Sequence, residues 1–304
     1  MHKELGIRTI MALGIAIIFW ASAFSGIRAA LEDFSPGPMA LFRFGVASLV
    51  LLAIVLLRGM PLLAKKDVPF FLVLGFLGIS VYHVALNYGE ITVTAGSASL
   101  LIGSAPIFTV ILAKIFLKEK LSLRGWVGII VSFGGIALIS LGEGEGYAID
   151  AGALLILLAA ICVSIFFVFQ KFLHNRYSPF QITTYSIWAG TMFLLVFLPG
   201  LIDEMANASS ANILTVVYLG VFPAALAYMV WNYALSKVPA SILASVLNIT
   251  PVLAIFIGWV WLDEVPTMLA IVGGVAAITG VVIVNRYGMR RAKESLNSDI
   301  ATLE

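Results

Sequence analysis

Two prolines, Pro106 and Pro251, stand inside long apolar segments and have small polar neighbours. Because proline has no backbone N–H, each one frees a helix carbonyl four residues earlier. Paired proline-interrupted segments are a sequence sign of a site for a transported solute. We therefore predict that the polar side chains beside them bind a substrate: Ser99, Ser104, Asn248 and Thr250. The alternative is that both prolines only kink their helices.

Arg43 is the one charged residue expected well inside an apolar segment. An ionised side chain at the centre of a bilayer costs at least ~2.5 kcal/mol, so it is usually retained for a reason. A guanidinium matches a carboxylate with two parallel hydrogen bonds, which predicts a clamp for an anionic group. Two structural alternatives stay open, namely snorkelling to the interface and hydrogen bonds to helix-end carbonyls.

His83 is the one histidine expected within a span, and its helical spacing places it on the same face as Asn87, beside Tyr88. All three are candidate substrate-binding residues. Because the ordinary pKa of histidine is about 6.5, His83 could carry a proton, which makes a proton the candidate coupling ion. The alternative is a neutral, hydrogen-bonded structural histidine. No Asp or Glu is expected at mid-depth to compete for the proton.

Trp20 falls near the middle of the first apolar segment, away from the interface where tryptophan is usually enriched. With Ser22 it could line an amphipathic cavity, and core packing is the equal alternative. The second half of the chain supplies Trp231 and Asn232 as further candidates. Four residues are predicted hinges: Gly78, Pro106, Pro223 and Pro251.

The composition indicates what must position these residues. The chain has 304 residues, of which 61% are hydrophobic and 11% charged, whereas a soluble domain has roughly 25% charged residues. This predicts an all-α polytopic membrane protein, with the lipid bilayer and a small molecule as partners. The net charge of +2 and the dispersed basic residues do not suggest a nucleic-acid partner. No enzyme, metal-site or cofactor signature is found, and we expect a monomer or a homodimer.

A membrane helix needs about 20 apolar residues, and this length divides the chain into ten predicted spans. Strands are a poorer interpretation, because the apolar runs are twice the length of a barrel strand and do not alternate. The predicted spans are 9–29, 38–57, 68–88, 95–117, 124–141, 151–171, 180–199, 212–235, 241–262 and 267–286.

One stretch of the chain occurs twice. The pair Asn87-Tyr88 returns 145 residues later as Asn232-Tyr233, without a gap. The same register relates further pairs: Pro106 and Pro251, Glu119 and Glu264, Gly128 and Gly273, and Gly135 and Gly280. Since Asn, Pro and Glu are scarce in apolar segments, a shared register favours a duplicated unit of five helices.

The positive-inside rule orients the chain. With the N-terminus in the cytoplasm, sixteen of the 18 basic residues fall on the cytoplasmic side. The opposite connectors are acidic and lack Lys and Arg. Both termini are then cytoplasmic, and because each half has an odd number of spans, the two halves form an inverted repeat.

Several short motifs carry a family resemblance. They are Phe19-Trp20-Ala21-Ser22-Ala23-Phe24, Phe42-Arg43-Phe44, Asn87-Tyr88 and Leu117-Lys118-Glu119-Lys120. In order and spacing they resemble the EamA-type branch of the drug/metabolite transporter superfamily. The resemblance implies bacterial inner-membrane carriers, many of which export amino acids and other small metabolites. It also implies a central cavity bounded by the first, third, fourth, sixth, eighth and ninth spans.

We therefore expect a first repeat over residues 1–142, a second over 143–290 and a cytoplasmic tail over 291–304. The predicted function is export of a small zwitterionic metabolite, such as an amino acid, by alternating access. Two alternatives remain: an exchanger of anionic metabolites or phosphate esters, and a membrane scaffold or sensor that transports nothing.

Overall fold

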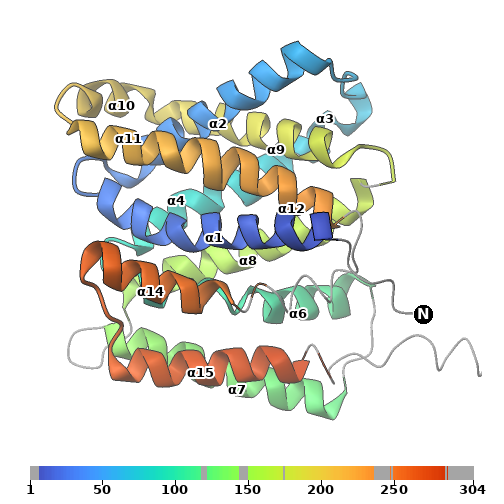
Figure 1. The fold of residues 1–304 in the computed structure, drawn as a ribbon. Helices are drawn as coiled ribbons and strands as arrows, with labels where there is room; N and C mark the ends of the chain where they lie inside the picture. The colour runs from blue at the N-terminus through green and yellow to red at the C-terminus, as the bar shows by residue number, and fades with distance from the viewer. Residues whose placement is uncertain are drawn as a thin grey trace, which may run out of the picture.

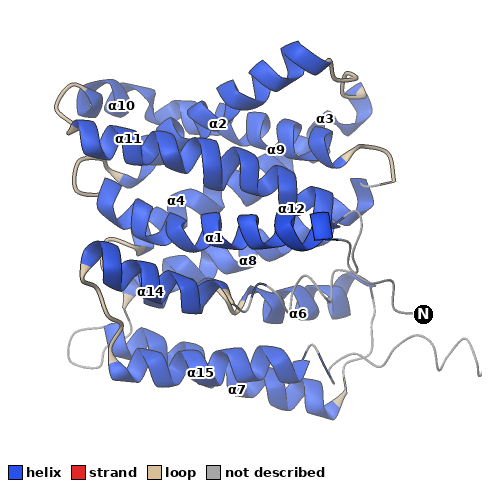
Figure 2. Cartoon of the chain, viewed as in Figure 1, coloured by secondary structure: helices blue, strands red, loops and turns tan. Residues whose placement is uncertain are grey.

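The computed structural model describes residues 7–117, 122–143, 150–173, 175–235, 247, 249–284 and 286. Over these residues the chain is helical and has no strand, as Figure 2 shows. The all-α prediction is therefore confirmed for the described part of the chain.

The described residues of the first half form seven α-helices and two short irregular helical segments. They are α1 (Ile7–Ala30), α2 (Pro36–Arg58), η1 (Lys65–Asp67), α3 (Val68–Gly75), η2 (Phe76–Val81), α4 (Tyr82–Gly89), α5 (Ala95–Ile102), α6 (Ala105–Leu117) and α7 (Leu123–Glu143).

The second half repeats this order. It contains α8 (Ala151–Leu173), α9 (Pro179–Leu194), η4 (Leu195–Phe197), α10 (Leu198–Met205), α11 (Ser210–Leu219), η5 (Gly220–Leu226), α12 (Ala227–Leu235), α14 (Thr250–Leu262) and α15 (Met268–Ile283).

Within the described part of the chain, seven helical segments are long and apolar enough to cross a membrane. They are Met11–Ala30, Pro36–Arg58, Lys65–Gly89, Leu123–Gly142, Ala151–Gln170, Pro179–Met205 and Ser210–Ala234. Three shorter apolar helices, Ala95–Thr109, Thr250–Leu262 and Met268–Ile283, lie where the fourth, ninth and tenth spans are predicted. Large apolar side chains cover the outside, with Leu57 85% exposed and Val196 73% exposed, as expected for a surface in contact with lipid.

The fifth helices of the two halves, α7 and α15, pack against each other at one side of the molecule (Figure 1). A Cβ atom built on Gly135 would lie 2.4 Å from the backbone oxygen of Gly273, and one on Gly128 would lie 2.8 Å from that of Gly280. The two backbones thus touch at glycines that the sequence repeat relates. Because Gly128 meets Gly280 while Gly135 meets Gly273, the equivalent helices α7 and α15 run antiparallel.

Two predicted spans are interrupted rather than continuous. The span 95–117 is broken into α5 and α6 at Gly103 and Ser104, so Pro106 is the second residue of a new helix and not a kink inside a long one. Pro251 likewise stands in the first turn of α14. Proline fits this position, because the N–H groups at a helix start have no intrahelical partner.

The third and eighth predicted spans each contain a π-helical segment. These segments are η2, which includes Gly78, and η5, which includes Pro223. Proline removes one backbone hydrogen bond in η5. At position 78 in η2 there is no room for a side chain larger than that of glycine, because a Cβ on Gly78 would lie 2.3 Å from the ring of Phe166. The two predicted hinges thus lie at matching irregular positions.

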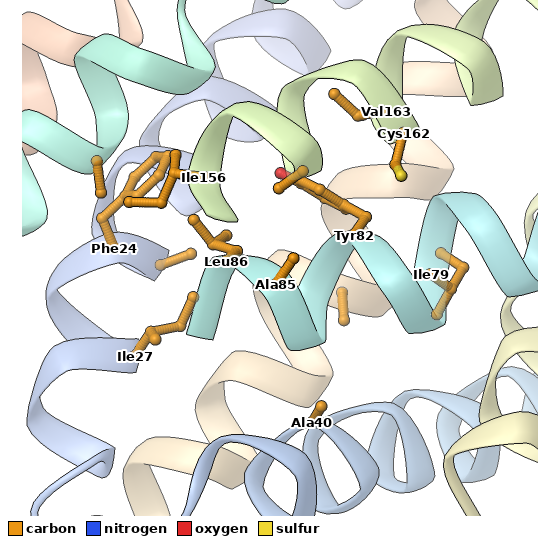
Figure 3. Packing of buried hydrophobic residues seen from close by; sticks show 14 of the residues in the cluster. Phe24, Ile27, Ala40, Ile79, Tyr82, Ala85, Leu86, Ile156, Cys162 and Val163 are labelled. Carbon is orange, nitrogen blue, oxygen red and sulfur yellow. The ribbon is translucent and has the colours of Figure 1, made fainter. Parts of the chain in front are cut away.

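Buried apolar side chains join α4 to the helices on both sides of it. Figure 3 shows Tyr82 and Leu86 of α4 near Ile156 and Val163 of α8, with Phe24 of α1 beside Leu86. Gly89 lets the α4 and α8 backbones approach, since its Cβ would lie 2.7 Å from the oxygen of Gly152. This packing brings the first and second halves together around one central region.

Candidate functional site

A central cavity lies among helices from both halves of the chain. The space between its lining residues is at most about 790 Å³ with the open solvent at its mouth included, so the cavity suits a small molecule and not a macromolecule. Its walls come from α1, α2, α4, α5, α6, α8, α12 and α14. The family resemblance implied these walls except α2, which contributes Arg43.

Most of the cavity wall is apolar and aromatic. Trp20 lines the cavity, with its ring 5.5 Å from that of Tyr228 and 5.0 Å from that of Trp231. The indole Nε1 of Trp20 donates to the carbonyl of Pro223 at 3.1 Å, which ties α1 of the first half to η5 of the second. Phe24 and Phe167 extend the wall. Such a surface suits the apolar part of an amphipathic ligand.

Arg43 supplies a cation to this wall. Its side chain is only 2% exposed, and neither Nε nor Nη1 has a hydrogen-bond partner among the described residues. The guanidinium carbon lies 5.4 Å from the centre of the Phe44 ring. Arg43 therefore neither snorkels to the interface nor binds helix-end carbonyls, the two structural alternatives considered from the sequence. A buried guanidinium with unpaired N–H groups has the chemistry to bind a carboxylate.

His83 lies beside Arg43 in the cavity wall and is 3% exposed. Its ring stands 4.4 Å from the ring of Phe44, and its Nε2 is 3.4 Å from the hydroxyl of Tyr228. Its Nδ1 has no partner among the described residues. The ring is thus held between aromatic groups, next to a cation that disfavours a second positive charge.

The helix interruptions of the two halves meet at the cavity. Gly103, at the end of α5, lies against Pro251, since a Cβ on Gly103 would be 3.2 Å from the Pro251 ring. Ser99, Pro106 and Thr250 also line the cavity, and the Thr250 hydroxyl has no partner among the described residues. The C-terminal carbonyls of a helix carry partial negative charge, so the end of α5 can attract a cationic group.

Charged residues lie at the end of the cavity that Ile27 and Leu86 line. Arg28 Nε donates to Glu264 Oε1 at 2.8 Å, and Arg28 Nη1 donates to the carbonyls of Glu90 and Ile91. Glu264 Oε2 accepts the backbone N–H of Ala95 at 3.2 Å. Arg28 and Glu264 thus join the two halves of the chain. The sequence repeat pairs Glu264 with Glu119 but gives no contact partner for it.

Glu90 is the functional candidate that the sequence reasoning missed. It was assigned to an acidic connector, yet it is 0% exposed. The spacing in the sequence could have identified Glu90. It follows Leu86 by four residues and therefore continues the face of α4 that lines the cavity. Its burial depends on α1 and α14 covering it, which the sequence does not reveal.

Six predicted substrate-binding residues lie outside the cavity wall. The Ser22 hydroxyl lies 2.6 Å from that of Tyr218, and Asn87 Nδ2 donates to the carbonyl of Pro36 at 3.0 Å. Asn232 Nδ2 donates to the hydroxyl of Thr183 at 2.6 Å. Tyr88 is 44% exposed, Ser104 donates to the carbonyl of Leu101, and Trp231 packs behind Trp20. Asn248 lies outside the described residues.

The structure thus brings seven of the predicted residues together in the cavity wall. They are Trp20, Arg43, His83, Ser99, Pro106, Thr250 and Pro251.

Comparison with known proteins places the chain in a family of transporters. A transporter from Bacillus subtilis (strain 168), YdfC, which is uncharacterized, is 44% identical over 90% of each chain. A probable terminal-alkyne amino-acid exporter from Streptantibioticus cattleyicolor is 35% identical over 95% of this chain and 97% of the relative. A solved structure that is 16% identical has the same fold, with a TM-score of 0.61 over 90% of this chain and 96% of that one.

The sequence profile of the EamA-like transporter family matches the chain twice, over residues 7–141 and 150–286. The two matches follow the two halves seen in the sequence and in the order of the helices. The protein is a multi-pass membrane transporter and not an enzyme. The chain belongs to the EamA-like transporter family.

Proposed function

We propose that this transporter exports a small zwitterionic metabolite, and specifically an amino acid with an apolar side chain. The observation that carries the proposal is Arg43, a cation with unpaired N–H groups in the wall of an otherwise apolar cavity. Leaving such a group buried without a partner is costly, and a substrate carboxylate would provide that partner. Arg43 is thus the carboxylate-binding residue.

The other parts of a zwitterion match other parts of the wall. The apolar side chain packs against Trp20, Phe24 and Phe167, which offer aromatic surface without a competing charge. The ammonium group faces the C-terminal end of α5 near Gly103, where helix carbonyls carry partial negative charge. No carboxylate side chain lines the described part of the cavity wall, so backbone carbonyls take this role.

The relative from Streptantibioticus cattleyicolor supports this substrate class, because it is named a probable exporter of a terminal-alkyne amino acid. An alkyne is apolar and needs an apolar wall. An exchanger of phosphate esters is less well supported, since a doubly charged phosphate calls for several cationic donors. Here Arg43 is the one Lys or Arg among the described lining residues.

Alternating access accounts for the symmetric arrangement. The two repeats, 1–142 and 143–290, would rock about the central cavity in the cytoplasmic membrane, with both termini and the 291–304 tail in the cytoplasm. The antiparallel α7 and α15 support opposite orientations of the repeats. The irregular segments around Gly78 and Pro223 and the breaks at Pro106 and Pro251 are the proposed hinges.

Counterflow in proteoliposomes tests the proposal. Vesicles that hold the purified protein and unlabelled L-leucine should accumulate labelled L-leucine, and a panel of other amino acids should show preference for apolar side chains. Arg43→Gln should reduce this exchange at least tenfold, because one charge-assisted hydrogen bond contributes about 1.5–3 kcal/mol. The matched control is Arg58→Gln, which removes an exposed arginine and should exchange normally.

Absence of counterflow for every amino acid in the panel would overturn the substrate class. Absence of any solute flux would favour the scaffold or sensor instead.

A further inference from the structure

Glu90 is a buried carboxyl group that has no role in the substrate binding proposed above. It lies one residue beyond the helical segment Lys65–Gly89 and is 0% exposed. Neither Oε1 nor Oε2 has a hydrogen-bond partner among the described residues. Buried carboxylates are normally paired or hydrogen-bonded, so an unpartnered one calls for a physical explanation.

The charged groups around Glu90 come from three different helices or their ends. Arg28 of α1 donates to the backbone carbonyl of Glu90, but its Nε is engaged by Glu264 at the end of α14. Arg43 of α2 interacts electrostatically with Glu90 and keeps two unpaired guanidinium nitrogens.

On the α8 side, Asp150 instead accepts from Thr92 and from the backbone N–H of Ala153. On α4 itself, Tyr82 is the titratable group that also interacts with Glu90, and His83, about two helical turns before Glu90, lines the cavity as well.

Burial without a hydrogen-bond partner favours the neutral form of a carboxyl group over the charged form. A charged carboxylate between two arginines would be expected to form a hydrogen-bonded ion pair with one of them. Glu90 forms none, although Arg43 has N–H groups to spare. Burial raises the pKa of the Glu90 carboxyl well above its usual range, while Arg28 and Arg43 lower it and Glu264 raises it. Geometry and electrostatics therefore agree on a carboxyl group that can change its protonation state.

We propose that Glu90 is the proton-binding site of this transporter and that its charge is coupled to the substrate through Arg43. With Glu90 ionised, Arg43 is its counter-ion. With Glu90 protonated, Arg43 is left to bind another carboxylate. The proton comes from water on the side to which the cavity opens and returns to water on the other side, so no other reactant is needed.

The coupling to transport rests on the proposed function, because it requires a substrate that carries a carboxylate. That carboxylate and the Glu90 carboxylate compete for Arg43, so binding of the substrate favours protonation of Glu90. Substrate and proton therefore bind together. A metabolite that has accumulated in the cell leaves with one proton, and a metabolite outside enters with one.

The first test needs no substrate. Infrared spectroscopy of the purified protein should show the C=O stretching band of a protonated carboxyl group that disappears with a single midpoint as the pH is raised. Glu90→Gln should lack this band. Glu32→Gln, which removes an exposed carboxylate of a nearby loop, should keep it.

Arg43→Gln, which keeps Glu90 but removes the neighbouring cation, should raise the midpoint by about one pH unit or more. An unchanged band in Glu90→Gln would overturn the proton site. An unchanged midpoint in Arg43→Gln would overturn the coupling through Arg43.

The second test adds L-leucine as the probe, in weakly buffered solution with a pH indicator. Wild-type protein should take up close to one proton for each L-leucine bound, and Glu90→Gln should bind L-leucine without proton uptake and with an affinity that does not change with pH. His83→Gln alters the cavity wall and can change the affinity, but it should still take up close to one proton for each L-leucine that it binds. Proton release on binding, or loss of proton uptake in His83→Gln only, would overturn the proposal. If wild type does not bind L-leucine, the proposed substrate class fails, while the infrared test still decides the role of Glu90.

Discussion

Arg43 and Glu90 illustrate how burial changes the role of a charged side chain. Both are at most 2% exposed, and each has atoms with no hydrogen-bond partner among the described residues. Charges on a protein surface are solvated and contribute little, whereas buried charges are costly unless a partner neutralises them. For Arg43 the proposed partner is the carboxylate of the substrate. For Glu90 it is a proton.

The stability of the protein should reveal the state of Glu90. Because burial raises the pKa of this carboxyl group, the folded protein holds a proton that the unfolded chain releases above its ordinary pKa near 4.5. The unfolded state then binds fewer protons, so the free energy of unfolding falls as the pH rises from about 4.5 toward the folded pKa.

Thermal unfolding of the protein in detergent, followed from pH 5 to pH 9, checks this prediction. The Tm of wild type should fall with pH more steeply than that of Glu90→Gln, which cannot lose a proton. Glu32→Gln should follow wild type, because its carboxyl group is solvent-exposed. Parallel Tm curves for wild type and Glu90→Gln would contradict a raised pKa at this position.

At the scale of helices, the cavity wall combines interrupted elements with the continuous helices α1, α2 and α8. The helices α5 and α6 are separated at Gly103 and Ser104, and η2 and η5 are π-helical. Helix interruptions expose backbone carbonyls, which are tolerated at membrane depth where they line a cavity. By contrast, α7 and α15 are regular helices that pack closely through glycines and do not line the cavity.

The glycine contacts between α7 and α15 should be essential for stability but not for the substrate site. Gly135→Ala places a methyl group 2.4 Å from the backbone of Gly273 and Ala277, so the helices must separate. Overpacking of this kind costs about 1–3 kcal/mol and should lower the Tm. The control is Gly134→Ala on the same helix, where nothing lies within 4 Å and alanine should be neutral or slightly stabilising. Equal Tm values for the two variants would show that the close packing is not required.

The paired prolines should matter for transport more than for folding. Pro106→Ala and Pro251→Ala together restore backbone N–H groups in the first turns of α6 and α14, where they can bond to carbonyls of the preceding segments. The helices should then become more continuous and the cavity less polar. We expect normal insertion, judged by yield and gel filtration, and counterflow reduced several-fold. Counterflow at the parental rate in the double variant would show that these prolines only shape the packing.

At the scale of the whole molecule, two sets of contacts join the repeats on one side of the protein. Arg28 with Glu264 forms one, and the second joins the loop after α1 to the loop before α11. There Asp33 accepts from the hydroxyl and N–H of Ser209 and from the side chain of Asn212. These hydrogen bonds lower the pKa of Asp33. Contacts between the repeats thus lie at the predicted outer side and also at the predicted cytoplasmic side, where Arg176 and the Tyr177 hydroxyl bind Asp67.

Cysteine labelling tests this orientation. In a Cys162→Ala background, Asn207→Cys should react in intact cells with a reagent that cannot cross the membrane, because its loop is predicted to be outside. Leu62→Cys, whose side chain is 92% exposed in a loop predicted to be cytoplasmic, should react only after permeabilisation. Asn207 is a suitable probe because its side chain bonds only to the nearby carbonyl of Asp203 in the described structure. The reverse labelling pattern would contradict the positive-inside assignment.

The sequence by itself determined the class of protein, the repeat and several residues of the cavity. Composition and segment length require membrane helices, because only these bury their backbone polar groups in lipid. The shared register of Pro106 with Pro251, and of Gly135 with Gly280, predicted a duplication that the family matches to residues 7–141 and 150–286 reflect. Such signals depend on local chemistry and spacing, so one chain is enough to read them.

Only the tertiary structure decided which polar residues share the cavity and which are structural. Asn87 and Asn232 repeat in the sequence, yet each donates its side-chain N–H to a neighbouring helix and lies outside the cavity wall. In the sequence, Glu90 resembles a residue of an acidic loop. In the fold its side chain is buried, and Arg28, which pairs with Glu264, donates to the Glu90 carbonyl. The physical reason is that burial and pairing depend on groups more than 60 residues apart along the chain, such as Arg28 and Ile91. Local spacing places a residue on one face of its helix, and only packing determines what that face meets.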